Sequence, residues 1–139
     1  ACHVLPIVFW TEKQVWEYIH KHGLPYMKYY DAPYNFTRHG CVGCPLATKP
    51  QMRIEFKTFP RYAINLMRAI KKFMESHPNT FWGKNFDNEY EAFYYYINDL
   101  SLQDFKFMKT ASMFKNDFKR MVMDFLNVDK TLLSKTGEI

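Results

Sequence analysis

Apolar residues recur at helical spacing along most of the chain. From Gln51 onward the pattern is helical, and Pro60 is well placed as the first residue of a helix that ends before His77. A further helix is predicted after Asp87, and Ser101 is positioned to cap a short one. The positions expected to face a core are Val15, Trp16 and Ile19; Ala63, Leu66, Met67, Ile70, Phe73 and Met74; Tyr90, Phe93, Tyr94 and Ile97; and Phe114, Phe118, Met121, Val122, Phe125 and Leu126.

The first fifty residues have a different pattern. Thr11 and Gln14 form a capping box that begins a helix ending at Gly23. The apolar run 4–10 before it is expected to be a short strand or an extended segment, and the proline-rich stretch 23–50 is expected to be a loop. The sequence therefore predicts a mainly α fold: an irregular helical domain with a cysteine-bearing loop and at most one or two short strands. We expect residues 1–50 and 51–139 to be separate regions, the second being one compact helical unit.

Composition narrows the class of protein. Of the 139 residues, 47% are hydrophobic and 19% aromatic, which is too apolar for a disordered tail. No apolar run approaches the roughly 20 residues that span a bilayer, so no membrane association is expected. The chain begins Ala-Cys-His without an initiator methionine, and we expect it to have been cut from a larger protein.

The three cysteines are the most reactive side chains of the sequence. Cys41 and Cys44 form a Cys-x-x-Cys turn, and an odd total with so close a pair suits a metal or redox site in the cytoplasm better than a disulfide framework. Two thiolates at this spacing can bind one metal ion, but zinc or a [4Fe–4S] cluster needs four ligands. The predicted metal ligands are Cys2, Cys41 and Cys44, with the fourth from His39, His3 or a missing upstream segment. Free or redox-active thiols are the alternative.

Basic charge is concentrated beside this pair. The net charge is +5, and residues 38–72 hold eight Lys/Arg and one Asp/Glu. Arg53, Lys57 and Arg61 recur every four residues, which on one helix would form a basic stripe, and Arg38 adjoins the cysteines. These four residues are the predicted anion-binding set, for phosphate of a nucleotide or of nucleic acid. A merely solvated basic face is the alternative.

Three segments, taken in order, carry a resemblance to a known family. The first is Pro6-Ile7-Val8-Phe9-Trp10-Thr11 with the following Val15-Trp16-Glu17-Tyr18-Ile19 and Gly23-Leu24-Pro25-Tyr26. The second is Arg38-His39-Gly40-Cys41-Val42-Gly43-Cys44-Pro45. The third is Glu55-Phe56 with Phe59-Pro60-Arg61-Tyr62, followed by Glu91-Ala92-Phe93. Together they resemble the region that follows the nucleotide-binding core in phosphoadenosine-phosphosulfate (PAPS) reductase-like proteins of the adenine nucleotide α-hydrolase superfamily. The resemblance extends over roughly residues 2–98.

The resemblance implies an N-terminal α/β domain that binds ATP or an adenylylated sulfate through a Ser-Gly-Gly-x-Asp-Ser loop. This sequence does not contain that loop. We therefore expect a C-terminal fragment of an enzyme acting on an adenylylated sulfur species, by sulfate reduction or sulfur transfer, that is inactive alone. Its expected partners are its own nucleotide-binding domain and an adenine nucleotide substrate, with ATP or PAPS bound only in the presence of that domain. The family also favours an iron–sulfur cluster over zinc.

The chain departs from the thioredoxin-dependent reductases of this family. Those enzymes carry a Glu-Cys-Gly-x-His segment, whereas no cysteine follows Cys44 here. Thioredoxin-dependent PAPS reduction is thus not expected unless Cys2, Cys41 or Cys44 substitutes. The alternative functions are a non-enzymatic cysteine–metal module that binds nucleic acid through residues 38–72, sulfur transfer to nucleic acid as in DNA phosphorothioation, and a helical interaction domain.

Overall fold

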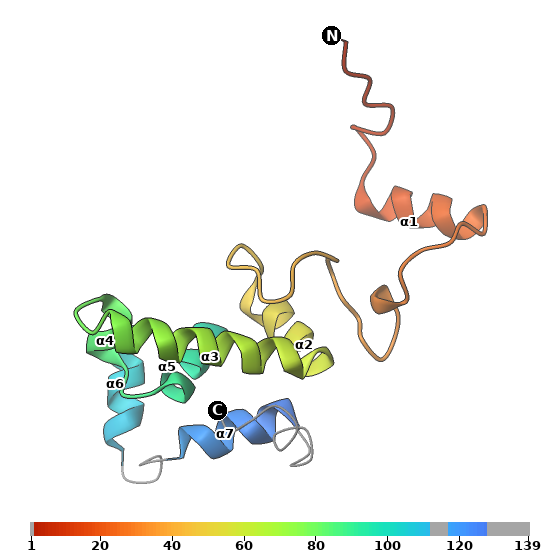
Figure 1. Cartoon of the computed structure of the whole chain (residues 1–139). Coiled ribbons are helices and arrows are strands. Elements are labelled where there is room, and N and C mark those ends of the chain that lie inside the picture. The colour runs from red at the N-terminus through yellow and green to blue at the C-terminus, as the bar shows by residue number, and fades with distance from the viewer. Residues whose placement is uncertain (1, 112–116, 128–139) are drawn as a thin grey trace.

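The computed structural model describes residues 2–111 and 117–127, and within these ranges the chain is helical and contains no strand. Figure 1 shows a compact group of helices from which the N-terminal part of the chain extends. We call residues 2–36 the arm, residues 37–48 the cysteine loop, and residues 49–111 with 117–126 the helical body. The elements are α1 (Glu12–Lys21), the 3-10 helix η1 (Lys28–Tyr30), α2 (Lys49–Thr58), α3 (Pro60–Ser76), α4 (Phe81–Asn85), α5 (Glu89–Ile97), α6 (Leu102–Thr110) and α7 (Phe118–Leu126).

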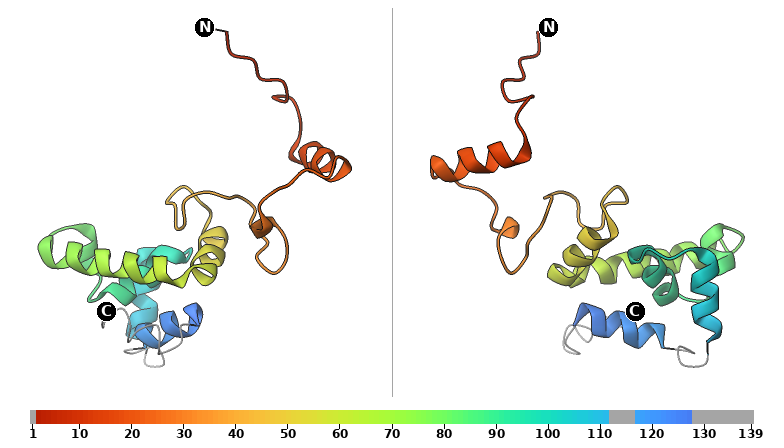
Figure 2. Two further views of the ribbon diagram at one scale, coloured as in Figure 1. Left: turned by 45° about the vertical axis from the view of Figure 1, so that its right-hand side comes forward. Right: turned by 180° about the vertical axis from the view of Figure 1, so that it is seen from behind.

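The first part of the arm, including α1, stands away from the helical body in all views (Figures 1 and 2). At the end of the arm Phe36 is buried, and its ring contacts Phe59 at 6.3 Å between ring centroids. The predicted capping box at Thr11 and Gln14 is present and begins α1, which has no buried residue. Around α1 the arm has local ring contacts in place of a core, including Trp16 edge-on to Tyr26 at 5.2 Å between ring centroids. The apolar run 4–10 was expected to be a strand or an extended segment, and it contains turns instead of a strand. Its amides form local hydrogen bonds, as the Val8 amide does with the Leu5 carbonyl oxygen.

The helical body is built round α3 and α5, which pack against each other, while α7 packs on α5 and α2 bridges the three. Pro60 begins α3 as predicted, since the first turn of a helix needs no amide proton there. Among the predicted core positions Phe114 lies outside the described residues, as does the tail after Asn127. The short helix α4 was not predicted. The buried core consists of Met52, Phe56, Ala63, Ile64, Met67, Phe86, Tyr90, Ala92, Phe93, Ile97, Phe105, Phe118, Val122 and Leu126.

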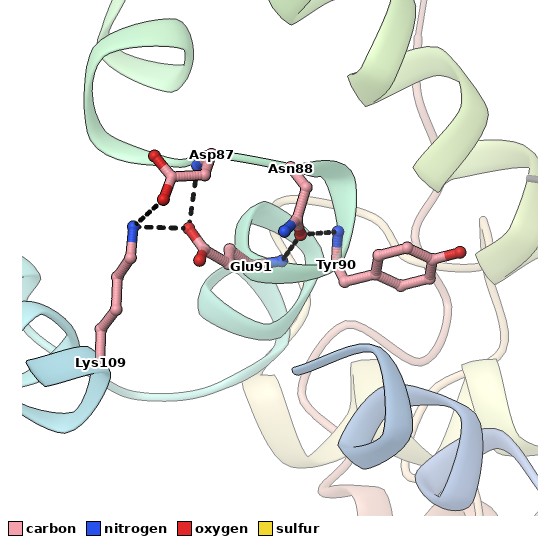
Figure 3. Close-up of polar contacts among 5 residues, drawn as sticks. All are labelled: Asp87, Asn88, Tyr90, Glu91 and Lys109. Carbon is pink, nitrogen blue, oxygen red and sulfur yellow. Dashed lines mark hydrogen bonds and ion pairs between the residues drawn. The ribbon is translucent and has the colours of Figure 1, made fainter. Parts of the chain in front are cut away.

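A polar network joins α5 to α6 (Figure 3). Asn88 caps α5 by accepting hydrogen bonds from the amides of Tyr90 and Glu91, both at 3.0 Å. The buried Glu91 carboxylate accepts from the amide of Asp87 at 2.9 Å and pairs with the Lys109 ammonium at 3.1 Å. Lys109 also reaches Asp87 at 2.6 Å. Burial by itself would lower the pKa of Lys109, but its hydrogen bonds to the two carboxylates and their charges outweigh burial and raise that pKa above 10.5.

The cysteine loop joins the core at Gly43. This residue has φ +70°, a conformation that glycine adopts without strain. A Cβ atom placed on it would lie 2.3 Å from Cζ of the buried Phe56 ring, so the backbone of the loop rests directly on that ring. Neighbouring Val42 packs against the same core. None of the helices in the ranges 2–111 and 117–127 is long and apolar enough to cross a membrane.

Replacing Lys109 by methionine is expected to lower the free energy of unfolding by about 1–3 kcal/mol, because the buried Glu91 carboxylate loses its cation. The raised pKa of Lys109 means that the stabilisation is complete at neutral pH and is lost as the pH rises through that value, above 10.5. Urea unfolding at pH 7 measures the change. Lys106→Met, on the same helix at an exposed site, is the control and is expected to be neutral. Equal losses for the two variants would contradict the network's role.

Replacing Gly43 by alanine is expected to destabilise the protein by about 2–4 kcal/mol, from a left-handed backbone that disfavours a side chain and from overlap with Phe56. Gly40→Ala is a matched control within the same loop. Gly40 has no positive φ, and its nearest neighbour to an added Cβ is Arg38 Nε at 3.9 Å. Denaturant titration of both variants should show a change below about 0.5 kcal/mol for Gly40→Ala.

Candidate functional site at the cysteine loop

The two cysteines of the loop lie at the ends of one tight turn. The amide of Cys44 donates to the carbonyl oxygen of Cys41 at 3.2 Å, and the positive φ of Gly43 at the third position allows the chain to reverse. Cys41 is exposed and Cys44 half-buried, and both are free thiols. The turn thus presents two thiols, close together, where a metal ion, an oxidant or a reaction partner can reach them.

A buried glutamine on α2 anchors the start of the loop. The Gln51 side chain is only 4% exposed. Its Oε1 accepts from the amide and the hydroxyl of Thr37 at 3.0 and 2.9 Å, and its Nε2 donates to the carbonyl oxygen of Arg38 at 3.2 Å. Because a buried amide needs partners for all its polar groups, these contacts fix the path of residues 37–38 against the body.

Two side chains hold the turn itself at Gly43. The carboxylate of Glu55, 3% exposed, accepts from the Gly43 amide at 2.8 Å and from Gln51 Nε2 at 3.0 Å. The hydroxyl of Tyr96, on α5, donates to the Gly43 carbonyl oxygen at 2.9 Å. Burial raises the pKa of Tyr96 above its ordinary value of 10.0, and the negative charge of a Cys44 thiolate raises it further. The turn is therefore bonded from both sides to two different helices.

The predicted metal ligands are not gathered in one place. Cys2 lies at the exposed start of the arm, which Figure 2 shows far from the segment that precedes α2. His39 stacks on Tyr29 at 5.8 Å between ring centroids, and its amide donates to the Tyr30 hydroxyl. Among the described residues no three His, Cys, Asp or Glu side chains are grouped so as to hold a metal ion. The structure brings together Cys41 and Cys44 alone, and the full ligand set stays a prediction.

The predicted basic stripe is divided between two helices. Arg53 and Lys57 lie on α2, whereas Arg61 follows the break at Phe59–Pro60 and lies in the first turn of α3. Arg53 donates to the carbonyl oxygen of Ile97 at 2.9 Å, and Lys57 lies over the Phe125 ring at 5.1 Å. The expectation of one continuous stripe was wrong because Pro60 ends the first helix. Arg38 and Arg61 remain exposed to solvent.

An open cavity of about 460 Å³ lies on the body near the loop. Tyr96 connects the two, since it lines the cavity and also bonds to Gly43. Lys49 crosses the cavity edge, with its ammonium 2.6 Å from the Tyr96 carbonyl oxygen and 4.8 Å from the centroid of that ring. The lining residues are Lys49, Trp82, Tyr95, Tyr96, Asn98, Asp99, Leu100 and Ser101.

Sequence reasoning did not identify Gln51, Glu55 and Tyr96 as site residues. A partial signal exists for the first pair, since a Gln and a Glu four residues apart share one face of a helix. Tyr96 gives none, because it lies 53 residues from Gly43 and packs against the core as its neighbours Tyr94 and Tyr95 do.

Comparison with known proteins finds a family match for the part of the chain that contains the three cysteines. Residues 1–47 match the model of the phosphoadenosine phosphosulfate reductase domain. The adenosine 5'-phosphosulfate reductase of Staphylococcus haemolyticus is 46% identical over 41 residues, which are 30% of this chain and 16% of that enzyme. The Bacillus anthracis enzyme of the same name is 40% identical over 47 residues, 34% of this chain and 19% of that enzyme.

The matching segment is thus less than a fifth of the length of these relatives. No solved structure matches the chain. Residues 48–139 lie outside the family match, and Cys2, Cys41 and Cys44 all lie inside it. The N-terminal third of this chain, from residue 1 to residue 47, is therefore similar to the PAPS reductase domain.

Proposed function

We propose that the chain is part of a PAPS-reductase-like enzyme that acts on an adenylylated sulfur species, by sulfate reduction or by sulfur transfer. The observation that carries this proposal is the Cys41–Cys44 turn, which lies within the family-matched segment and holds one exposed and one half-buried free thiol. Relatives that share this segment are named for reduction of adenosine 5'-phosphosulfate. The nucleotide itself would be bound by an α/β domain outside this chain, since the sequence lacks the Ser-Gly-Gly-x-Asp-Ser loop.

The thiols fit a metal centre in part. Cys41 and Cys44 at the ends of one turn are suited to provide two thiolate ligands to one iron or zinc ion. A [4Fe–4S] cluster or a tetrahedral zinc would need two more ligands, and neither Cys2 nor His39 lies with the pair in the described part of the chain. In this proposal the remaining ligands come from the arm after rearrangement or from the nucleotide-binding domain. Such a centre would supply electrons or hold the sulfur species, while the turn fixes its position.

The exposed apolar side chains of the arm support a contact between the arm and another domain. Val4, Leu5 and Phe9 are 79%, 66% and 95% exposed, although they belong to a consecutive apolar run. A contiguous apolar surface of this kind marks a place where another surface packs. Because the arm belongs to the family-matched segment, we assign it to contact with the nucleotide-binding domain of the same enzyme.

The metal content of the purified protein tests the cysteine centre. Anaerobically prepared protein, as the complete chain with its nucleotide-binding domain, is expected to contain iron and acid-labile sulfide, or otherwise zinc. Replacing Cys41 and Cys44 together by serine is expected to remove the metal, because serine hydroxyls do not replace thiolates as soft ligands. Protein in which elemental analysis finds neither iron nor zinc would contradict a metal centre and leave redox-active thiols as the alternative.

The contact of the arm with the nucleotide-binding domain is testable with one pair of variants. Phe9→Asp is expected to weaken association of the two parts by at least tenfold, because a carboxylate would replace a buried ring at the interface. Phe107→Asp is a matched control: Phe107 is 76% exposed on α6 of the body and is not part of the arm. Calorimetry measures both affinities, and also whether residues 1–139 alone bind ATP or PAPS. Micromolar nucleotide binding by these residues alone would overturn the division of labour proposed here.

A further inference from the structure

The residues that hold the cysteine turn lie outside the segment that the family model matches. The match ends at residue 47, whereas Gln51 and Glu55 are on α2 and Tyr96 is on α5. That match therefore assigns no role to the helical body. The helical body nevertheless contacts the turn between Cys41 and Cys44, which belongs to the preceding segment.

The contacts concentrate on one residue between the cysteines. Gly43 donates its amide to Glu55 and accepts from Tyr96 through its carbonyl, so both peptide groups that flank its Cα are fixed. Its Cα faces the Phe56 ring so closely that no side chain fits between them. Three independent contacts, from two helices, thus determine one residue of a four-residue turn.

The chemistry of these contacts indicates more than packing. Glu55 is a buried carboxylate whose oxygens accept hydrogen bonds from the Gly43 amide and from Gln51. Burying a carboxylate has a large desolvation free energy, which apolar packing of the loop would not have required. Hydrogen bonds, unlike apolar contacts, specify distance and direction, which is what two thiols need in order to act on the same atom.

We propose that Glu55 and Tyr96 are positioning residues that clamp Gly43 and thereby hold Cys41 and Cys44 at the separation required for joint action, as metal ligands or as a dithiol. This proposal rests on the proposed function, in which Cys41 and Cys44 form the functional site. The helical body is then the support of the cysteine site. Neither residue touches a reacting sulfur atom in this proposal, and both act through the backbone of the turn.

The equilibrium between dithiol and disulfide reports on the clamp without any metal. In this reaction Cys41 and Cys44 lose two protons and two electrons as the S–S bond forms, and oxidised glutathione takes them up to leave as two reduced molecules. A turn with its first and fourth residues bonded has Cα atoms within about 7 Å, and a disulfide needs about 4.4–6.8 Å. A clamped turn therefore favours the disulfide, and a loosened turn lowers the effective concentration of one thiol at the other.

The experiment uses the metal-free chain carrying Cys2→Ser, equilibrated anaerobically with glutathione buffers and assayed by alkylation and mass spectrometry. Tyr96→Phe removes only the hydroxyl and is expected to shift the equilibrium about tenfold toward the dithiol, which corresponds to about 30 mV. Tyr95→Phe, on the same helix with its ring against Phe86 and Phe105, is the matched control and is expected to stay within about twofold of the parent.

Glu55→Gln is the second variant. A glutamine offers one carbonyl oxygen where Glu55 offers two, so either Gly43 or Gln51 loses its acceptor, and a shift in the same direction as Tyr96→Phe is expected. Thermal unfolding of each variant checks that it is folded. If both Tyr96→Phe and Glu55→Gln stay folded and lie within twofold of the parent, the clamp proposal is wrong. Metal content and nucleotide-domain binding decide the proposed function separately, since neither enters this equilibrium.

Discussion

The burial of α5 is the constraint on which the rest of the structure depends. This nine-residue helix has six buried residues and packs against α2, α3 and α7. Its central aromatic residue, Phe93, is completely buried and meets Phe56 of α2 edge-on at 5.2 Å between ring centroids. The backbone of Gly43 packs directly against the Phe56 ring. The position of the cysteine turn therefore depends on the packing of α5.

Several polar groups of α5 are buried with it and have partners of defined geometry. Glu91 at the start is paired with Lys109 and the Asp87 amide, while the carbonyl oxygens of Tyr96 and Ile97 at the end accept from Lys49 and Arg53. Cations at the C-terminal end of a helix satisfy carbonyl groups that have no partner within the helix. Two of the basic residues that the sequence places near the cysteines thus serve the core, which accounts for part of the local charge without a nucleic acid.

Local sequence determined most of the elements, and long-range contacts determined the site. The capping box at Thr11 and the start at Pro60 were predictable, because each depends on residues within one helical turn. The proximity of Cys41 and Cys44 at the two ends of one turn was predictable for the same reason. The contacts of Tyr96 and Glu55 with Gly43 were not, since they depend on how three segments fold together. The prediction of a continuous basic stripe from Arg53 to Arg61 was wrong because the four-residue spacing took no account of the helix break at Pro60. Helix α4 was not predicted because five residues are too few to show a helical pattern.

The position of the last family-matched residue has a consequence for how such chains diverge. Similarity ends at residue 47, yet the hydrogen bonds that shape the cysteine turn come from residues 51, 55 and 96. A recombination event at the edge of the family-matched segment would therefore separate the two thiols from the side chains bonded to the turn between them, even if every residue of that segment were retained.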